Sequence, residues 1–361
     1  MNINKLISIL PGIFLALSLY LLSDGINNVI GIEILGLEKS PISTVMIAIL
    51  LGIIMSNAFI PRPGFQIGLE FTQKYILKFG IICLGIRLSF DEFIKFGIIA
   101  VPLIIVCIVS VLVVIKILIK KFQISSKMSY LIAIGTSVCG ATAIVATAPI
   151  INAKKGEVAY AIANITLFGV FTMLVYPYFA NIYFEGNSLF AGLFLGTAIH
   201  ETSQVAAAGL IYDQQFNSPE TLNIATVTKL IRNTFLVILI PLFAFLYNRG
   251  EVKGKNYSIF SIFPYFVLGF IGMIIVRNIG DQIFLIENSN YEVYEIWKNL
   301  IGYVKILTTV FLTMAMAAVG ISINLNELKS MGYKPFVVGL IAAITVGFIS
   351  LIYIETLIKF I

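Results

Sequence analysis

Long apolar segments, separated by short polar connections, run through this chain from one end to the other. Each approaches the roughly 20 residues that an α-helix needs to cross about 30 Å of hydrocarbon. The pattern therefore predicts an all-α polytopic membrane protein with about nine to eleven transmembrane segments. The apolar segments cover residues 6–22, 42–60, 74–90, 96–119, 128–152, 157–183, 188–212, 222–247, 258–278, 300–324 and 334–358. No connection is long enough for a soluble domain, so residues 1–361 are expected to form a single integral membrane domain, with 279–299 as a loop or interfacial helix.

Two of these segments contain small and polar residues where apolar residues are expected. The first stretch is 135–151, GTSVCGATAIVATAPII, and the second is 196–212, GTAIHETSQVAAAGLIY. Irregular backbone is tolerated at membrane depth only where protein buries it or where it lines a cavity. The pattern therefore predicts two discontinuous segments, broken or re-entrant, at the functional centre of the protein.

Further self-similarity indicates an internal repeat. Residues 161–177 align with 225–241, and residues 83–97 resemble 318–332, a pair that would run antiparallel in the membrane. These matches predict an inverted-repeat transporter fold, although apolar segments also align by chance. The predicted half-repeats are residues 42–183 and 188–358.

The distribution of lysine residues leaves two topologies open. Lysine and arginine in short loops mark the cytoplasmic side of a membrane protein. If segment 128–152 crosses the membrane, Lys154 and Lys155 lie on the side opposite to Lys5. If 128–152 and 188–212 are re-entrant hairpins, all three lysines lie on the same side, which the charge rule favours.

Composition narrows the class of function. The chain is 59% hydrophobic and 12% charged, with a net charge of +6 whose basic residues are scattered at the ends of apolar runs. This scatter indicates topology signals, not a nucleic-acid surface. The three cysteines lie inside apolar segments without metal-ligand spacing, and no nucleotide-binding loop is present, so no metal, cofactor or enzymatic activity is expected.

The first polar stretch suggests an anion site. Hydroxyl groups cluster beside a glycine that permits a helix break, where exposed N–H groups and a helix N-terminus favour an anion. Close packing of small residues between helices is the alternative. The candidate residues are Thr136, Ser137, Cys139, Gly140 and Thr142.

The second stretch carries five consecutive polar residues, His200, Glu201, Thr202, Ser203 and Gln204. A charged side chain at the bilayer centre costs about 2.5 to 3.5 kcal/mol, so a carboxylate there indicates function. We expect His200 and Glu201 to couple substrate movement to protons or other ions, and the three residues after them to bind substrate. A loop in solvent, or a structural pair between Glu201 and Lys229, is the alternative.

Three residues that follow complete the candidate site. Lys229 and Arg232 share one helix face at i, i+3 and, if they face a cavity, favour an anionic substrate, with Asn233 beside them. A structural role or snorkelling toward a membrane surface is the alternative. Asn164 and Thr166 occupy the corresponding helix of the first half-repeat.

The strings SVCGATAI, GTAIHETSQVAAAG and ATVTKLIRN resemble the UPF0324 family of bacterial inner-membrane proteins, also named for a proposed sulfate export activity. The resemblance covers essentially the whole chain, although Thr202 and Ser203 stand where valine and alanine are common. It implies membership of the bile-acid/sodium symporter and cation/proton antiporter superfamily. Members of that superfamily have inverted repeats, two crossed discontinuous helices, and separate core and panel domains.

The expected function is therefore secondary active transport of a small inorganic or organic anion by alternating access, coupled to H⁺ or Na⁺. A channel or a passive membrane protein is the alternative, and an intramembrane enzyme is less favoured. We expect a multi-pass protein of the bacterial inner membrane, surrounded by lipid and without a nucleic-acid partner. A homodimer, the identity of the substrate and the direction of transport are left open.

Overall fold

A computed structural model describes residues 3–34, 40, 42–58, 63–122, 124–247, 265–284, 291–323 and 333–358. Within these residues every regular element is helical, and 7 helices are long and apolar enough to cross a membrane. These spans are Ile7–Gly31, Phe90–Phe122, Gly156–Tyr183, Pro219–Leu239, Phe266–Phe284, Tyr294–Ile321 and Tyr333–Thr356. The prediction of an all-α, multi-pass membrane protein is confirmed.

The chain divides into two compact units, and both draw on both halves of the sequence. Unit 1 comprises Met1–Phe93, Leu210–Pro219 and Tyr265–Glu327, and unit 2 comprises Ile94–Gly209, Glu220–Pro264 and Leu328–Ile361. The half-repeats 42–183 and 188–358 therefore do not coincide with these units, and they stay a prediction.

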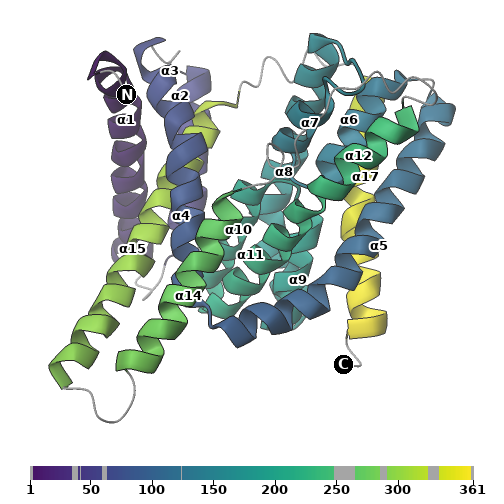
Figure 1. The fold of residues 1–361 in the computed structure, drawn as a ribbon. Coiled ribbons are helices and arrows are strands. Elements are labelled where there is room, and N and C mark those ends of the chain that lie inside the picture. The colour runs from purple at the N-terminus through teal and green to yellow at the C-terminus, as the bar shows by residue number, and fades with distance from the viewer. Residues whose placement is uncertain are drawn as a thin grey trace. The chain divides into compact units, whose positions relative to one another are not determined.

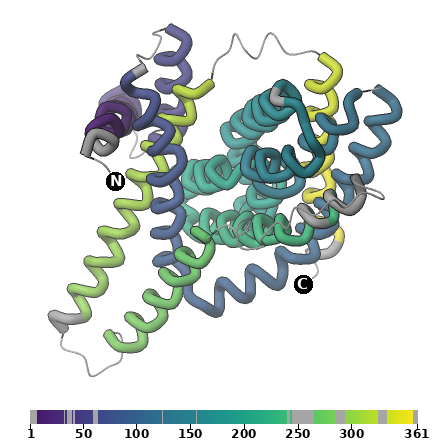
Figure 2. Tube along the Cα trace, turned by 45° about the horizontal axis from the view of Figure 1, so that its top comes forward, coloured from purple at the N-terminus to yellow at the C-terminus, as the bar shows by residue number. Residues whose placement is uncertain are grey.

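Unit 1 is built mainly from long helices that pack along one another. Its described elements are α1 (Ile3–Asn28), η1 (Val29–Ile34), α2 (Thr44–Ala58), α3 (Pro63–Phe71), η2 (Thr72–Ile76), α4 (Leu77–Leu84), η3 (Gly85–Arg87), α14 (Phe266–Phe284) and α15 (Tyr291–Ile321). Helix α15 packs along α2 and α4, and α1 packs along α3 (Figure 2). Gly52 allows a close approach of α2 to α15, because an added Cβ would lie 2.5 Å from the carbonyl oxygen of Ala317.

Unit 2 holds the first polar stretch singled out in the sequence and the second one as far as Gly209. Its described elements are most of α5 (Phe90–Phe122), then α6 (Ser126–Ser137), α7 (Ala141–Thr147), α8 (Lys155–Tyr183), α9 (Ser188–Ala198), the first half of α10 (Thr202–Phe216), α11 (Pro219–Thr234), α12 (Leu236–Tyr247) and α17 (Tyr333–Tyr353), followed by η4 (Ile354–Ile358). Helix α17 packs against α6, α8 and α9.

The first polar stretch forms a re-entrant hairpin. Helix α6 ends at Ser137, and α7 begins four residues later at Ala141. The two ends of the hairpin meet, because the Nζ of Lys127 donates to the carbonyl oxygen of Asn152 at 2.8 Å. The α6–α7 segment therefore begins and ends on the same side of unit 2. Helices α6 and α7 lie side by side in Figure 1.

The second polar stretch forms a hairpin of the same kind. Helix α9 runs parallel to α11, since Gly192 packs on Ile224 and Gly196 packs on Thr228. Helix α10 runs antiparallel to α11, because Gly209 packs on Leu222 near the start of α11, whereas Thr202 contacts residue 233 near its end. Helices α9 and α10 are therefore antiparallel to each other.

The two hairpins enter unit 2 from opposite sides. The first hairpin comes directly before the start of α8, and the second follows the end of α8. Helix α8 has 29 residues and is therefore about 43 Å long. Helices α6 and α9 have 12 and 11 residues, so each reaches about 17 Å inward. The hairpin tips therefore meet near the middle of α8, within the depth of a bilayer.

This arrangement decides between the two topologies. The re-entrant alternative, which the lysine distribution favoured, is the one in the structure, and the crossed discontinuous helices implied by the superfamily are not. Segments 128–152 and 188–212 therefore do not add complete crossings. The order of hairpin and long helix, α6–α7–α8, recurs inverted as α9–α10–α11, which gives the 161–177 and 225–241 alignment a structural basis.

Candidate functional site

Helix α11 carries two cations into the junction of the hairpin tips. Lys229 is completely buried, and its Nζ donates three hydrogen bonds to main-chain carbonyl oxygens at the tips. The acceptors are Val138 at 2.9 Å, Ile199 at 3.0 Å and His200 at 2.5 Å. A lysine has three donor hydrogens, so this ammonium group is saturated by carbonyl groups of both tips.

Arg232, one helix turn later, is also completely buried, and it binds main-chain carbonyl groups of the same two hairpin tips. Its Nε donates to the carbonyl oxygen of Ser137 at 2.8 Å, and its second terminal nitrogen donates to that of Thr136. Its first terminal nitrogen bonds the carbonyls of Thr197 at 2.5 Å and Ile199 at 3.4 Å. One guanidinium group therefore joins the end of α6 to the end of α9.

These contacts follow from the chemistry of a helix end inside a membrane. The last carbonyl groups of a helix have no intrahelical partner and carry about half a negative charge. Here two such C-terminal ends meet where water is scarce, so the unsatisfied carbonyls need donors. The two cations supply both hydrogen bonds and charge, which explains how they remain buried without a carboxylate partner.

The first tip depends on Gly140. Its φ of 67° and ψ of −126° lie in a region that residues with a side chain rarely adopt. Its N–H donates back to the carbonyl oxygen of Gly135 at 3.0 Å, which closes the turn. A Cβ added to Gly140 would lie 3.3 Å from the Cβ of Glu201. The glycine therefore provides both the turn and the space for the first side-chain carbons of Glu201 in the other tip.

The second tip carries the titratable pair. His200 is buried, whereas the side chain of Glu201 is partly accessible. Glu201 interacts electrostatically with Lys229 and Cys139, yet within the described residues it forms no ion pair. The alternative of a structural pair between Glu201 and Lys229 is therefore not seen at contact distance, and Glu201 remains available to a ligand or a proton.

The first turn of α10 is held by two neighbouring helices. Asn233 of α11 donates from Nδ2 to the Oγ1 of Thr202 at 2.9 Å. The Nε2 of Gln204 donates to the carbonyl oxygen of Thr166 on α8 at 3.3 Å. The carboxamide of Gln204 lies directly against Gly169, at the midpoint of α8, where a Cβ would overlap it.

Four buried polar atoms around the tips have no hydrogen-bond partner within the described part of the chain. They are Ser137 Oγ, His200 Nδ1, Gln204 Oε1 and Asn233 Oδ1. Leaving a buried polar group without a partner costs about 1 to 3 kcal/mol. Their concentration at one junction indicates a place where water, an ion or a substrate completes the bonding.

The structure places most of the predicted site residues at this junction. Thr136, Ser137, Cys139 and Gly140 form the first tip and His200 to Gln204 the second, with Lys229, Arg232 and Asn233 joining them. Thr142 lies on an exposed face of α7. Asn164 donates to the carbonyl oxygen of Pro335 on α17 at 3.1 Å, and Thr166 contributes its carbonyl group. The substrate and coupling roles of all these residues stay predictions.

Sequence reasoning missed the backbone part of the site. The carbonyl groups of Val138 and Ile199 are acceptors for the buried cations, but their side chains are ordinary apolar residues. Gly169 was also missed, although a glycine in the middle of a long span is a signal of close packing. Arg87, in unit 1, is not part of this junction and pairs with Asp213 at 3.0 Å.

Comparison with known proteins assigns the chain to a family. The family model described as Conserved hypothetical protein 698 matches residues 14–339. A UPF0324 membrane protein of Streptococcus agalactiae is 34% identical over 310 residues, which cover 85% of this chain and 88% of that protein. The chain belongs to the UPF0324 family.

Other UPF0324 relatives extend this match. One from Fusobacterium nucleatum is 33% identical over 317 residues, covering 87% of this chain and 90% of its own. One from Clostridium tetani is 28% identical over 360 residues and covers 96% of both chains. No solved structure matches this UPF0324 chain. The relatives are described as membrane proteins, in agreement with the multi-pass fold.

Proposed function

We propose that this UPF0324 protein is a secondary active transporter of a small anion, such as sulfate or a sulfonate. The observation that carries the proposal is the junction of two re-entrant hairpins at mid-membrane depth, held by buried cations and bordered by polar atoms without partners. Irregular backbone and ionisable groups at membrane depth occur where substrates and ions pass.

The charge of the junction favours an anion. Lys229 and Arg232 are the fully buried cations of the described part of unit 2, and Glu201 is the acidic side chain beside them. Two positive charges and one negative charge leave an excess of one positive charge when Glu201 is ionised. The N–H groups in the first turn of α10 add a partial positive charge next to Glu201.

The cations act on the substrate mainly through their charge, because carbonyl groups occupy every donor hydrogen of Lys229 and all but one of those of Arg232. The direct contacts would come from the N–H groups of α10 and the hydroxyl group of Ser137. The free carboxamide oxygens of Gln204 and Asn233 are acceptors, so they suit a hydrated or protonated anion, or a Na⁺ coupling ion.

Protonation of Glu201 would couple the anion to a proton. Neutralising this carboxylate raises the excess charge of the junction from one to two, which strengthens anion binding. By linkage, a bound anion strengthens proton binding to Glu201 by the same factor. Proton and anion would then be bound together and carried in the same direction.

Transport in proteoliposomes tests the proposal. Purified protein is reconstituted, and uptake of radiolabelled sulfate is measured with and without a pH gradient or a Na⁺ gradient. We expect saturable uptake that is faster when the external solution is more acidic than the vesicle interior. We also expect unlabelled sulfate inside the vesicles to drive uptake of labelled sulfate by counterflow. If sulfate is inactive, sulfite, sulfonates and small carboxylates that stabilise the protein in a thermal-shift screen replace it. Uptake that is neither saturable nor coupled would indicate a channel.

The Glu201→Gln variant isolates the coupling step. It should fold and bind the anion as tightly at neutral pH as the parent protein does at acidic pH, and it should lose gradient-driven uptake. Glu220→Gln, an exposed carboxylate in the first turn of α11, is the matched control and should behave like the parent protein. Unchanged coupled uptake in Glu201→Gln would contradict the assigned role.

A further inference from the structure

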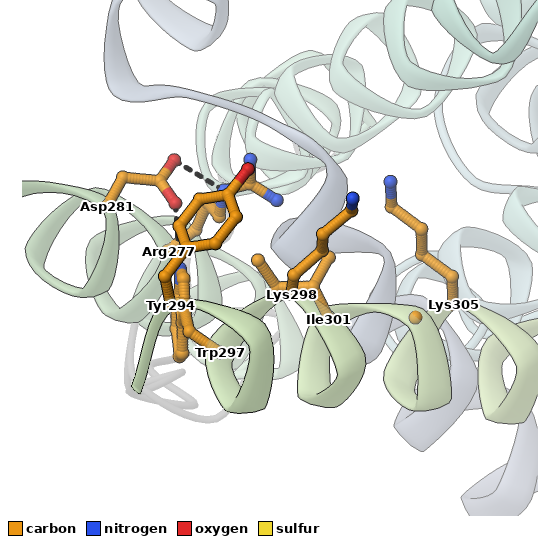
Figure 3. A pocket seen from close by; sticks show the side chains of 8 residues that line it. Arg277, Asp281, Tyr294, Trp297, Lys298, Ile301 and Lys305 are labelled. Carbon is orange, nitrogen blue, oxygen red and sulfur yellow. Dashed lines mark hydrogen bonds and ion pairs between the residues drawn. The ribbon is translucent and has the colours of Figure 1, made fainter. Parts of the chain in front are cut away.

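A second cation-rich region lies in unit 1, between α14 and α15. An open pocket of about 460 Å³ is lined by Arg277, Asp281, Tyr294, Trp297, Lys298, Ile301, Gly302 and Lys305. Figure 3 shows Lys298 and Lys305 rising from α15 on the side where Arg277 lies. These two lysines are seven residues apart, which is two helix turns, so they share one face of α15.

Among the residues that the structure describes, no hydrogen bond or ion pair involves the Nζ of Lys298 or Lys305, and Glu295, one turn before Lys298, forms no ion pair with it. Lys305 lies well inside the span Tyr294–Ile321, where an unpaired charge costs about 2.5 to 3.5 kcal/mol at the bilayer centre. A lysine in this position is expected to serve a ligand.

The acidic residue of the pocket lining, Asp281, already has partners. Asp281 accepts from the Nε of Arg277 at 2.6 Å and from the Nε1 of Trp297 at 2.9 Å. The pocket lining therefore contains three cations against one carboxylate, an excess of two positive charges. Arg87 and Asp213, which also act electrostatically on Lys305, pair with each other at 3.0 Å and leave that excess unchanged.

The pocket has room for a ligand because of Gly302. This residue lies on α15 between the two lysines, and a Cβ added to it would meet nothing within 4 Å. Glycine inside a helix costs about 1 kcal/mol relative to alanine, so its presence in this span is unfavourable for the helix itself. At this position the missing side chain leaves the space between the two ammonium groups open.

The pocket also lies close to one end of two spans. Arg277 and Asp281 belong to the last two turns of α14, and Tyr294 and Trp297 to the first two turns of α15. Tyrosine and tryptophan are typical of the membrane–water interface, where phospholipid head groups lie. A charged ligand can therefore enter the pocket from this end, where Tyr294, Trp297 and Lys298 line it.

We propose that the pocket between α14 and α15 binds an oxyanion of the phosphate or sulfate type, with Lys298 and Lys305 as its ligands and Arg277 close by. The oxyanion comes either from a free inorganic anion or from the head group of an anionic phospholipid. The site stands on its own contacts and is independent of the transport function proposed above.

Trp297 is the single tryptophan of the chain and lines the pocket, so its fluorescence reports on this site. The purified full-length protein is titrated at constant ionic strength, first with sodium sulfate or sodium phosphate against sodium chloride. In a second arm it is titrated with short-chain phosphatidylglycerol against phosphatidylcholine. We expect a saturable change in emission that the chloride and phosphatidylcholine controls do not produce.

Three variants test the assignment to this pocket. Lys298→Gln and Lys305→Gln remove one charge each, and because neither lysine is hydrogen-bonded to a described residue, both variants should fold at least as stably as the parent protein. Each should weaken binding at least tenfold. Gly302→Leu keeps every charge but fills the space, and it should weaken binding by a similar factor. Lys334→Gln, an exposed lysine on α17 in unit 2, should leave the titration unchanged.

The outcomes separate the two sources. Saturation by sulfate or phosphate alone supports a site for a free anion, and saturation only by phosphatidylglycerol supports a head-group site. The absence of any saturable response would overturn the proposal. So would a response that persists unchanged in both lysine variants or in Gly302→Leu.

Discussion

The two hairpin tips of unit 2 reach the same point in the membrane by different means. The first tip turns on Gly140, with a positive φ and no ionisable side chain except the buried thiol of Cys139. The second turns through Ile199, whose φ of −90° and ψ of 140° are extended and open to any residue, and it carries His200 and Glu201. The glycine of one tip makes room for the first side-chain carbons of Glu201 in the other.

This difference indicates a division of labour. Both tips present main-chain carbonyl groups to the same two cations of α11, so this part of the structure is shared. Only the second tip brings a group that can change its charge. The first tip is then a steric and backbone partner, and the variants below test whether the tips are coupled in this way.

The largest effect is expected from Arg232→Met, which removes the shared cation. Carbonyl groups of both tips would lose donors while still buried, at about 1 to 3 kcal/mol for each unsatisfied group. We expect a loss above about 3 kcal/mol, seen as a large fall in the thermal midpoint of the detergent-solubilised protein. Arg232→Lys keeps the charge but has a single nitrogen, so it should be intermediate. A stable Arg232→Met variant would show that the tips do not need this cation.

A smaller but definite effect is expected from Gly140→Ala. The alanine must adopt a φ near 67° and presses its Cβ against Glu201, which costs on the order of 1 to 3 kcal/mol. The same thermal assay measures the loss, and coupled uptake should fall with it because Glu201 is displaced. Gly156→Ala, near the start of α8, meets nothing within 4 Å and should be neutral or slightly stabilising. Equal stability of the two alanine variants would argue against contact between the tips.

The smallest effect concerns the bond between Thr202 and Asn233, which belongs to the second tip alone. Thr202→Val and Asn233→Leu should each cost about 1 kcal/mol. In the double variant the losses should not add, because the second change removes a bond already broken; a coupling of at least about 0.5 kcal/mol is expected. Strictly additive losses would mean that this bond contributes nothing to the position of the first turn of α10.

Local composition was enough to find the two tips, because glycine, hydroxyl and charged residues stand out inside apolar segments. Lys154 and Lys155 were also enough to favour hairpins. The preference of basic residues for the cytoplasmic side applies to each short loop, and only the hairpin topology places these two lysines on the same side as Lys5. The family resemblance alone indicated crossed helices, and the hydrogen bond of Lys127 to residue 152 shows a hairpin instead. Here the charge pattern of the chain was the better guide.

The partners of Lys229 and Arg232 could not be predicted. Sequence reasoning directed them toward a substrate, whereas in the structure their donors bind carbonyl groups, which every residue carries and which leave no trace in a sequence. The pocket of unit 1 was missed for another reason. Lys298, Gly302 and Lys305 follow a helical spacing, but the first of them fell in a stretch treated as a connection, whereas α15 already begins at Tyr291.

The sequence by itself determined that this protein is a helical, multi-pass membrane protein with two polar interruptions, because apolar length and breaks in it are local properties of the chain. The tertiary structure alone decided that the interruptions are hairpins from opposite sides and that their tips meet. It also decided that carbonyl groups of the tips bind Lys229 and Arg232, while Lys298 and Lys305 have no hydrogen-bond or ion-pair partner in the part of the chain that the structure describes. These features depend on which backbone atoms come together in space, and hydropathy along the chain contains no information about that.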